Sequence, residues 1–181
     1  NGDTDVKFVV HPGGMDMHKP LLADIPQLNK NLADSLKKLK ADGFELLIEN
    51  MPGCPWYFGG QWYHANFMAA DEIVAFAKKH KYGIVFDTSH AALYCNYYKK
   101  DLNEFAKTIL PVVKYVHISD GAKFNGEGLQ IGDGTIDFKA LLKQLVKKDV
   151  WLLPEIWQGH KFGGEGFMKG MRSLVKIQPD L

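Results

Sequence analysis

The sequence lacks the features that mark several broad classes of protein. Its two cysteines, Cys54 and Cys95, are too few for a disulfide scaffold and fit no Cys-x-x-Cys metal or redox motif. With 22 basic and 21 acidic side chains, the formal net charge is +1, so there is no strongly charged surface for nucleic acid or anionic membranes. No apolar run approaches the roughly 20 residues that span a bilayer, and residues 1–5 do not resemble a signal peptide. We therefore expect reduced thiols, a cytoplasmic location, no membrane association and no nucleic-acid partner.

What is present fits a folded domain. The 181 residues are 46% hydrophobic, which allows a substantial core and argues against disorder. No linker divides the chain, so we predict one domain over residues 1–181.

Strand and helix patterns alternate along the chain. Five apolar runs are continuous rather than alternating, which is typical of strands covered on both faces; they are residues 6–11, 44–49, 83–87, 113–119 and 150–156. Helical periodicity occupies residues 28–39, 71–80, 102–110, 138–147 and 166–175. We expect Gly43 to stop the first helix. The alternation predicts a parallel sheet with right-handed crossovers.

Side chains that bind metals or transfer protons lie at or near the ends of all five predicted strands. They are spaced by 38, 38, 30 and 38 residues and comprise His11, Glu49, Asp87, His117 and Glu155. A complete eight-unit α/β barrel of about 250 residues averages roughly 31 residues per βα unit, and its strand ends converge on one face. An open doubly wound sheet would spread these residues along an edge and usually carry a glycine-rich phosphate turn. The sequence at 11–14, His-Pro-Gly-Gly, is not that turn.

We therefore predict an α/β fold of the TIM-barrel type. Five βα units account for the 181 residues, so we expect only the last five of eight units. Five strands cannot close a barrel without exposing edges. We accordingly expect either a homo-oligomer or association with the missing N-terminal part.

The strand-end motifs suggest a metal site. Glu49 lies in Leu-Leu-Ile-Glu-Asn and Glu155 in Leu-Pro-Glu-Ile-Trp, with Asp87 and His117 between them. Either glutamate alone could be a solvated strand end, but the repeated pattern favours a site. Three carboxylates and one imidazole suit Mn²⁺, Mg²⁺, Co²⁺ or Zn²⁺.

Three further polar residues are candidates for substrate binding or support. His90 follows Asp87 by three residues, so both can face one pocket, although Asp87 or Ser89 could instead cap a following helix. Asp120 either orients a ligand or makes a turn with the next glycine. Lys123 either meets a substrate oxygen or is solvated.

The long loop at residues 51–67 is rich in aromatic residues, including Trp62. Such a loop suits binding to sugar faces, or else a hydrophobic plug or protein interface. His160 and Lys161 follow the last strand and could line the mouth of the site, but Glu165 beside them weakens a phosphate site there. The glycine-rich residues 126–134 form no Walker loop, so we predict a structured loop without a phosphate role.

These strand-end residues, in this order, resemble the xylose isomerase-like barrel superfamily, which includes sugar isomerases and epimerases, inosose dehydratases and endonuclease IV. The resemblance covers nearly the whole chain, aligned to the C-terminal five units. It implies one divalent metal ion held by Glu49, Asp87, His117 and Glu155. The same resemblance implies that the two glutamates are the catalytic acid/base pair.

The resemblance also implies that His90 and Lys123 contact substrate, and we add His11, Trp62 and His160 as substrate-binding candidates. We expect a metal-dependent isomerase or epimerase of a sugar or polyol, in which the metal polarises a carbonyl and stabilises an enediolate.

Two alternatives remain at this point. The chain could be an incomplete barrel that acts as a binding module. It could also be an abasic-site nuclease, since His11 resembles a ligand of the three-zinc site of endonuclease IV. The Asp-x-His that this branch needs after the strand histidine is missing, and the near-neutral charge argues against a DNA groove.

Overall fold

The computed structural model describes residues 6–20, 22–39 and 43–180. Its main sheet has five parallel strands in the order β1-β3-β7-β8-β11. Their bounds are β1 (Val6–Val10), β3 (Phe44–Glu49), β7 (Gly83–Asp87), β8 (Val113–Ile118) and β11 (Trp151–Pro154). Each strand therefore pairs with the next predicted strand along the chain. This order confirms the predicted fold, a TIM-barrel-like parallel sheet of five βα units.

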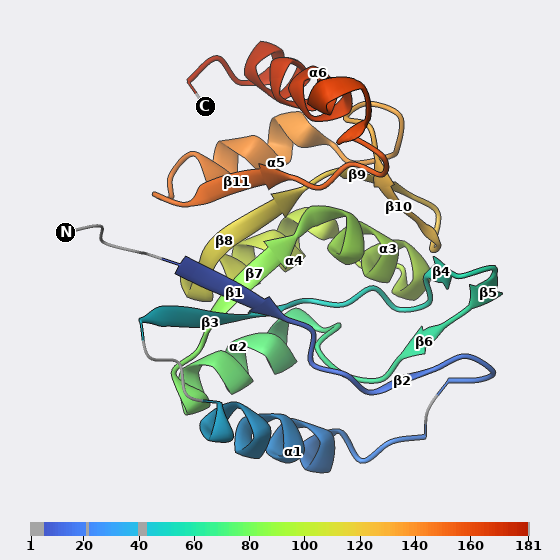
Figure 1. The fold of residues 1–181 in the computed structure, drawn as a ribbon, viewed down its shortest axis with the longest axis vertical. Coiled ribbons are helices and arrows are strands. Elements are labelled where there is room, and N and C mark those ends of the chain that lie inside the picture. The colour runs from blue at the N-terminus through green and yellow to red at the C-terminus, as the bar shows by residue number, and fades with distance from the viewer. Residues whose placement is uncertain (1–5, 21, 40–42, 181) are drawn as a thin grey trace.

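The helices form an arc around the outer side of this sheet, from α1 at one end to α6 at the other (Figure 1). They are α1 (Ile25–Lys38), α2 (Ala70–His80), α3 (Thr88–Tyr98), α4 (Leu102–Ile109), the short 3-10 helix η1 (Leu110–Val112), α5 (Phe138–Leu145) and α6 (Lys161–Ile177). Within the described ranges, every helix is too short or too polar to cross a bilayer.

Three small two-stranded antiparallel sheets lie beyond the carboxyl ends of the main strands (Figure 1). They pair β2 (Met15–Asp16) with β6 (Tyr63–His64), β4 (Trp56–Tyr57) with β5 (Gly60–Gln61), and β9 (Asp120–Ala122) with β10 (Gly126–Leu129). The long aromatic loop thus contributes three of these short strands. It covers the end of the sheet where the candidate site residues lie.

Two details of the predicted helices need correction. Helix α1 ends at Lys38, with Leu39 as its C-cap, so Gly43 lies beyond the helix and does not stop it. Helix α3 is not among the predicted helical ranges, although capping by Asp87 anticipates a helix after it. Most of its first eight residues are buried, from Thr88 to Cys95, so it lacks the single apolar stripe by which an amphipathic helix is recognised.

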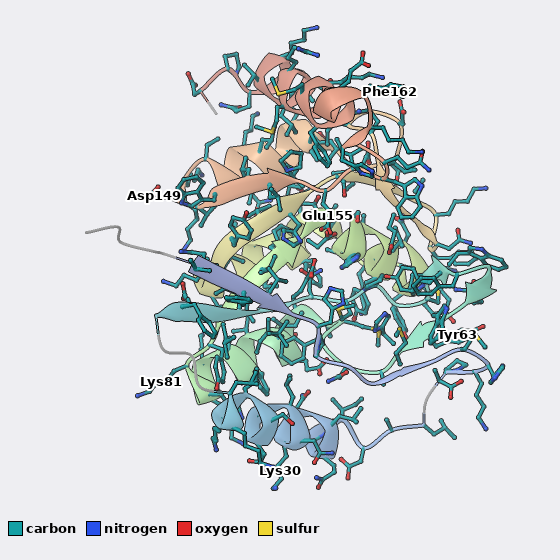
Figure 2. All side chains as sticks on the ribbon, in the orientation of Figure 1. Lys30, Tyr63, Lys81, Asp149, Glu155 and Phe162 are labelled. Atoms are coloured by element: carbon teal, nitrogen blue, oxygen red, sulfur yellow. The ribbon has the colours of Figure 1, made fainter. Side chains whose placement is uncertain are left out.

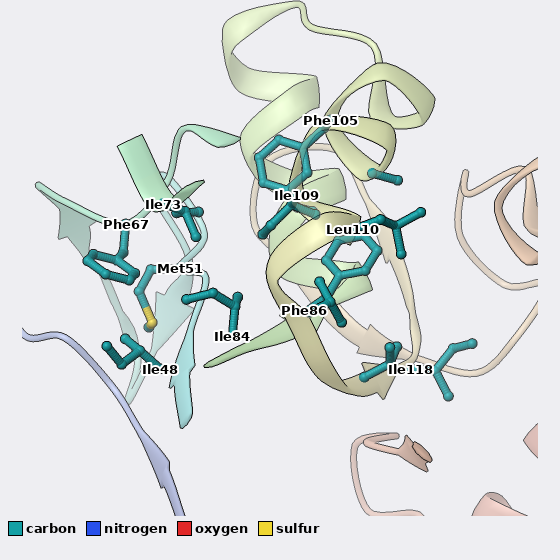
Figure 3. Packing of buried hydrophobic residues seen from close by; sticks show 14 of the residues in the cluster. Ile48, Met51, Phe67, Ile73, Ile84, Phe86, Phe105, Ile109, Leu110 and Ile118 are labelled. Carbon is teal, nitrogen blue, oxygen red and sulfur yellow. The ribbon is translucent and has the colours of Figure 1, made fainter. Parts of the chain in front are cut away.

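The core lies between the sheet and the helices (Figure 3). Ile84 and Phe86 of β7 are fully buried, as are Ile48 of β3 and Ile109 of α4. The rings of Phe86 and Phe105 stack with their centroids 6.1 Å apart. Burial of one such side chain stabilises the fold by about 1.5–3 kcal/mol. The three central strands are thereby held firmly, and their carboxyl ends form a rigid base.

The two outer strands differ from the prediction that all five are covered on both faces. Phe8 of β1 is 50% exposed and Trp151 of β11 is 74% exposed. Each strand is the last on its side of the sheet, so it has a neighbouring strand on one side only. The burial that the continuous apolar pattern predicts is therefore correct for β3, β7 and β8. It is wrong for β1 and β11.

Candidate metal centre

The strand register brings the four predicted metal ligands together. Asp87, at the end of β7, pairs directly with His117 of β8. Glu49 ends β3 and pairs with the residue two positions before Asp87. Glu155 directly follows β11, and its backbone N–H donates to the carbonyl of Ile118 at the end of β8. Because side chains two residues apart in a strand share a face, these four side chains point to the same side.

Ligand atoms from Glu49, Asp87, His117 and Glu155 all lie within 4.8 Å of one another. The first three side chains are buried, whereas that of Glu155 is 54% exposed. Figure 2 shows Glu155 near the middle of the molecule. The cluster therefore has a buried floor and one ligand at an accessible side.

His117 pairs with both glutamates. Its Nδ1 lies 2.9 Å from Oε1 of Glu49 and 2.7 Å from Oε2 of Glu155. Burial favours the neutral ring, but the hydrogen bonds with Glu155 and Glu49 outweigh it and raise the pKa of His117 to about 10. Burial likewise opposes ionisation of the two glutamates. The hydrogen bonds with His11 and His117 nevertheless lower the pKa of Glu49, and the one with His117 lowers that of Glu155. A protonated imidazole thus neutralises carboxylates that a divalent cation would otherwise neutralise.

Asp87 has two structural roles. Its Oδ1 accepts hydrogen bonds from the backbone N–H of His90, at 2.6 Å, and from Oγ of Ser89, at 2.9 Å, so it is the N-cap of α3. Burial, together with the charges of Glu49 and Glu155, raises the pKa of Asp87 to about 7. The capping alternative is thus correct. It does not compete with metal binding, because a carboxylate has several acceptor positions.

His90 is held in place by Asn50. The Nδ1–H of His90 donates to the Asn50 carbonyl, 2.9 Å away. The Asn50 side chain in turn accepts from the Asp87 N–H and donates to the Asp87 carbonyl, at 2.8 and 3.0 Å. Burial opposes the charged ring, but Asp87, Glu49 and Glu127 raise the pKa of His90 to about 9. No sequence pattern singles out Asn50, although it directly follows Glu49.

His11 contacts the cluster from outside. Its Nε2 lies 2.9 Å from Oε2 of Glu49, and this hydrogen bond raises the pKa of the ring. The His11 side chain is 63% exposed, and the ring does not belong to the group of converging ligand atoms. His11 therefore lies where it can orient Glu49.

A cavity of about 520 Å³ opens beside the cluster. Its lining includes two of the ligands, Asp87 and Glu155, and two of the predicted substrate-binding residues, His90 and His160. It also includes four residues that carry no substrate-binding prediction from the sequence: Glu127, Trp157, Gln158 and Lys161.

Three predicted substrate-binding residues do not line this cavity: His11, described above, Trp62 and Lys123. The indole Nε1 of Trp62 donates to the Tyr57 carbonyl, at 3.1 Å, so this ring braces the aromatic loop. Lys123 is exposed between β9 and β10, and its carbonyl accepts from the side chain of Asn96. Contact of any of the three with substrate stays a prediction.

Asp120 is neither part of the ligand cluster nor a simple turn residue. Its buried carboxylate accepts four backbone N–H groups at 2.8–3.1 Å, from Gly121, Gly132, Gly134 and Ile136. It therefore holds the loop between β10 and α5 against the end of β8.

Comparison with known proteins identifies the fold. A search of solved structures finds a D-tagatose 3-epimerase-like protein with a TM-score of 0.66 and 21% identity. It also finds the IOLI protein with a bound zinc atom, at 0.66 and 15%, and endonuclease IV from Thermus thermophilus, at 0.60 and 18%. These matches cover 95–97% of this chain, which spans 62% of each of those chains. No curated protein matches.

The family comparison agrees with the sheet order and with the strand-end cluster. The model of the family described as "Xylose isomerase-like TIM barrel" matches residues 3–177. The match includes all five main strands and all four predicted ligands. The chain therefore belongs to the xylose isomerase-like TIM barrel family.

Proposed function

We propose that this chain carries the metal centre and the acid/base pair of a divalent-metal-dependent sugar isomerase or epimerase. The observation that carries this proposal is the convergence of ligand atoms from Glu49, Asp87, His117 and Glu155 within 4.8 Å. The adjoining cavity, about 520 Å³, falls in the range of about 300–1,000 Å³ that small-molecule sites occupy. A monosaccharide fits such a volume.

The donor set fits a divalent cation. Three carboxylates and one imidazole suit Mn²⁺, Zn²⁺, Co²⁺ or Mg²⁺. Burial and the charges of Glu49 and Glu155 raise the pKa of Asp87. A cation bound among these carboxylates would relieve the repulsion between them. When bound, the ion would polarise a substrate carbonyl and stabilise the negative charge of an enediolate. The zinc-bound structural neighbour is consistent with this assignment.

Proton transfer belongs to the two glutamates. Both are held ionised beside His117, which lowers the pKa of each against the effect of burial. The glutamate on one face, ionised, accepts the proton from the carbon next to the carbonyl. The glutamate on the other face takes up a proton from solvent before it delivers one to the enediolate. His90, which lines the cavity beside them, donates a hydrogen bond to a substrate oxygen.

Substitution of Glu49 with glutamine tests the proposal. The Mn²⁺-loaded chain is assayed for interconversion of ketohexoses, and the variant should lose turnover by on the order of 10²–10⁴-fold, the usual contribution of a general acid or base. The matched control is Glu45→Gln, an exposed position on the same strand, which should retain turnover. Circular dichroism should show the same fold in both variants. Full turnover in Glu49→Gln would contradict the assignment.

A second candidate is a binding module without turnover. The observation in its favour is the exposure of the outer strands, since Phe8 and Trp151 leave apolar surface uncovered at both edges of the sheet. The measured mass in solution and the metal content separate the two. A monomeric, folded chain that binds no metal and turns over no ketohexose would favour the binding module.

A further inference from the structure

Glu127 is a carboxylate of the cavity that does not belong to the ligand cluster. It lies on the short strand β10 and lines the cavity together with His90 and Glu155. Its side chain is only 26% exposed. A carboxylate this far from solvent needs polar partners.

The backbone around Glu127 is fixed on both sides. The Gly128 carbonyl accepts the Trp157 N–H at 2.7 Å, which ties β10 to the segment that directly follows Glu155. Gly128 has a φ of +65°, and a Cβ there would lie 3.4 Å from the Trp157 nitrogen. A Cβ on Gly126 would lie 3.0 Å from the Ala122 carbonyl of β9. Glycines therefore allow the close packing that aims Glu127 at the cavity.

Tyr57 supplies the hydrogen bond that the structure gives to this carboxylate. Its hydroxyl donates to Oε2 of Glu127 at 3.0 Å. Burial, and then the charge of Glu127, raise the pKa of Tyr57 above its usual range, so the hydroxyl stays a donor. The Tyr57 ring lies edge-on to His64, with centroids 6.4 Å apart, and the Trp62 indole donates to the Tyr57 carbonyl. The aromatic loop thus positions the donor.

Glu127 has acceptor capacity left over. His90 Nε2 is 3.6 Å from Oε2, which is an ion-pair distance but too long for a hydrogen bond. A carboxylate has about four acceptor positions, and within the described part of the chain the Tyr57 hydroxyl fills one of them. The remaining positions are available to donors that enter the cavity.

We propose that Glu127 recognises hydroxyl groups of a neutral polyol and selects against substrates with a carboxylate or phosphate at the corresponding end. Sugar hydroxyls donate to a carboxylate in strong, charge-assisted hydrogen bonds. An anionic group would instead meet a like charge in a poorly solvated site, where the repulsion is larger than in water. The buried His90 ring is already paired with Glu127, Glu49 and Asp87. Lys161, at the cavity opening, is exposed, so salt and water screen its charge. This inference rests on the proposed sugar chemistry and names its substrate class.

The test compares three ligands by isothermal titration calorimetry with the Mn²⁺-loaded chain: D-tagatose, D-tagatose 6-phosphate and the 6-carboxylate D-tagaturonate. The wild type should bind D-tagatose at least tenfold more tightly than either anion. Glu127→Gln should reduce this ratio to less than threefold. Glu104→Gln removes the same charge from an exposed residue of α4 that does not line the cavity, and it should keep the wild-type ratio. Thermal melts establish that both variants are folded.

The outcomes separate this inference from the proposed function. An unchanged ratio in Glu127→Gln, or a wild type that binds an anion as tightly as D-tagatose, overturns the role of Glu127. Binding of D-tagatose that depends on Glu127 but not on Mn²⁺ supports this role and overturns the metal-dependent mechanism. A wild type that binds none of the three ligands overturns both. If Glu127→Gln does not fold, Tyr57→Phe takes its place, since it removes the hydroxyl that donates to Glu127 and should weaken D-tagatose binding while leaving both anions unaffected.

Discussion

Replacing Asp87 with asparagine separates the metal-binding role of this side chain from its structural role. Asparagine is as good an N-cap as aspartate, so its oxygen can keep the hydrogen bonds from the backbone N–H of His90 and the hydroxyl of Ser89. The negative charge is lost. Alanine would remove the cap as well, at a cost of about 1 kcal/mol, and would confuse the two effects.

The metal-free protein should respond to this change with higher stability. The pKa of Asp87 is raised to about 7 by burial and by the charges of Glu49 and Glu155, whereas an unfolded aspartate has a pKa of about 3.9. A raised pKa means that stability is lost as the pH rises through 7, because the buried group must then ionise. At pH 8 asparagine avoids this cost, which amounts to at most about 4 kcal/mol.

With metal present the stability advantage of Asp87→Asn should shrink, because the wild type gains more from the ion. Free Mn²⁺ at 100 times its Kd would stabilise the wild type by about 2.7 kcal/mol, or about 5–11 °C in Tm for a chain of this size. Loss of residues that merely support metal ligands weakens binding by about 10–100-fold, so loss of a direct ligand should cost at least about 100-fold. At the same Mn²⁺ concentration, the metal should then stabilise Asp87→Asn by only about 0.4 kcal/mol, which raises its Tm by about 1–2 °C.

Thermal melts at pH 8, with Mn²⁺ and with excess chelator, measure these shifts, and elemental analysis should find about one ion per wild-type chain. The matched control is Asp101→Asn, the same change at the exposed N-cap of α4, which should keep the full metal-induced shift. An equal shift in Asp87→Asn and the wild type would refute the role of Asp87. A wild-type Tm that ignores both Mn²⁺ and chelator would refute the metal site itself.

Two further predictions concern residues away from the metal cluster. Asp120→Ala should lower the free energy of unfolding by about 3–5 kcal/mol in a urea titration, because four backbone N–H groups lose their buried acceptor; a loss below about 1 kcal/mol would show that water replaces the carboxylate. Cys54 and Cys95 should resist iodoacetamide at pH 8 in the folded protein and react in denaturant, as followed by mass spectrometry, because both are buried and free and burial raises the pKa of Cys95 to about 12. Rapid labelling of either thiol in the native chain would argue against this packing.

Much of the fold could be predicted because its signals are local. A continuous apolar run predicted each of the main strands, and the bounds of β3 and β7 agree with the predicted ranges. Parallel strands joined by helices place their carboxyl ends together. The strand-end positions of Glu49 and Asp87 therefore predicted that they would lie close to each other, although 38 residues separate them.

Other features depend on contacts that no local pattern records. Helix α3 is buried on most sides, so its sequence has no amphipathic period. The exposure of β1 and β11 depends on where the sheet ends, which the same apolar pattern does not reveal.

Local sequence patterns are enough to predict which residue types stand at the strand ends, because strand propensity and order along the chain are local properties. The rest of the site depends on long-range contacts in the folded chain. Glu127 meets Tyr57 from 70 residues away, and His90 meets the Asn50 carbonyl from 40. Asp120 collects its four N–H donors from its own neighbour and from the loop that folds back over it. The long-range contacts form only when the crossovers have brought separate strand ends side by side, so their chemistry is a property of the folded sheet.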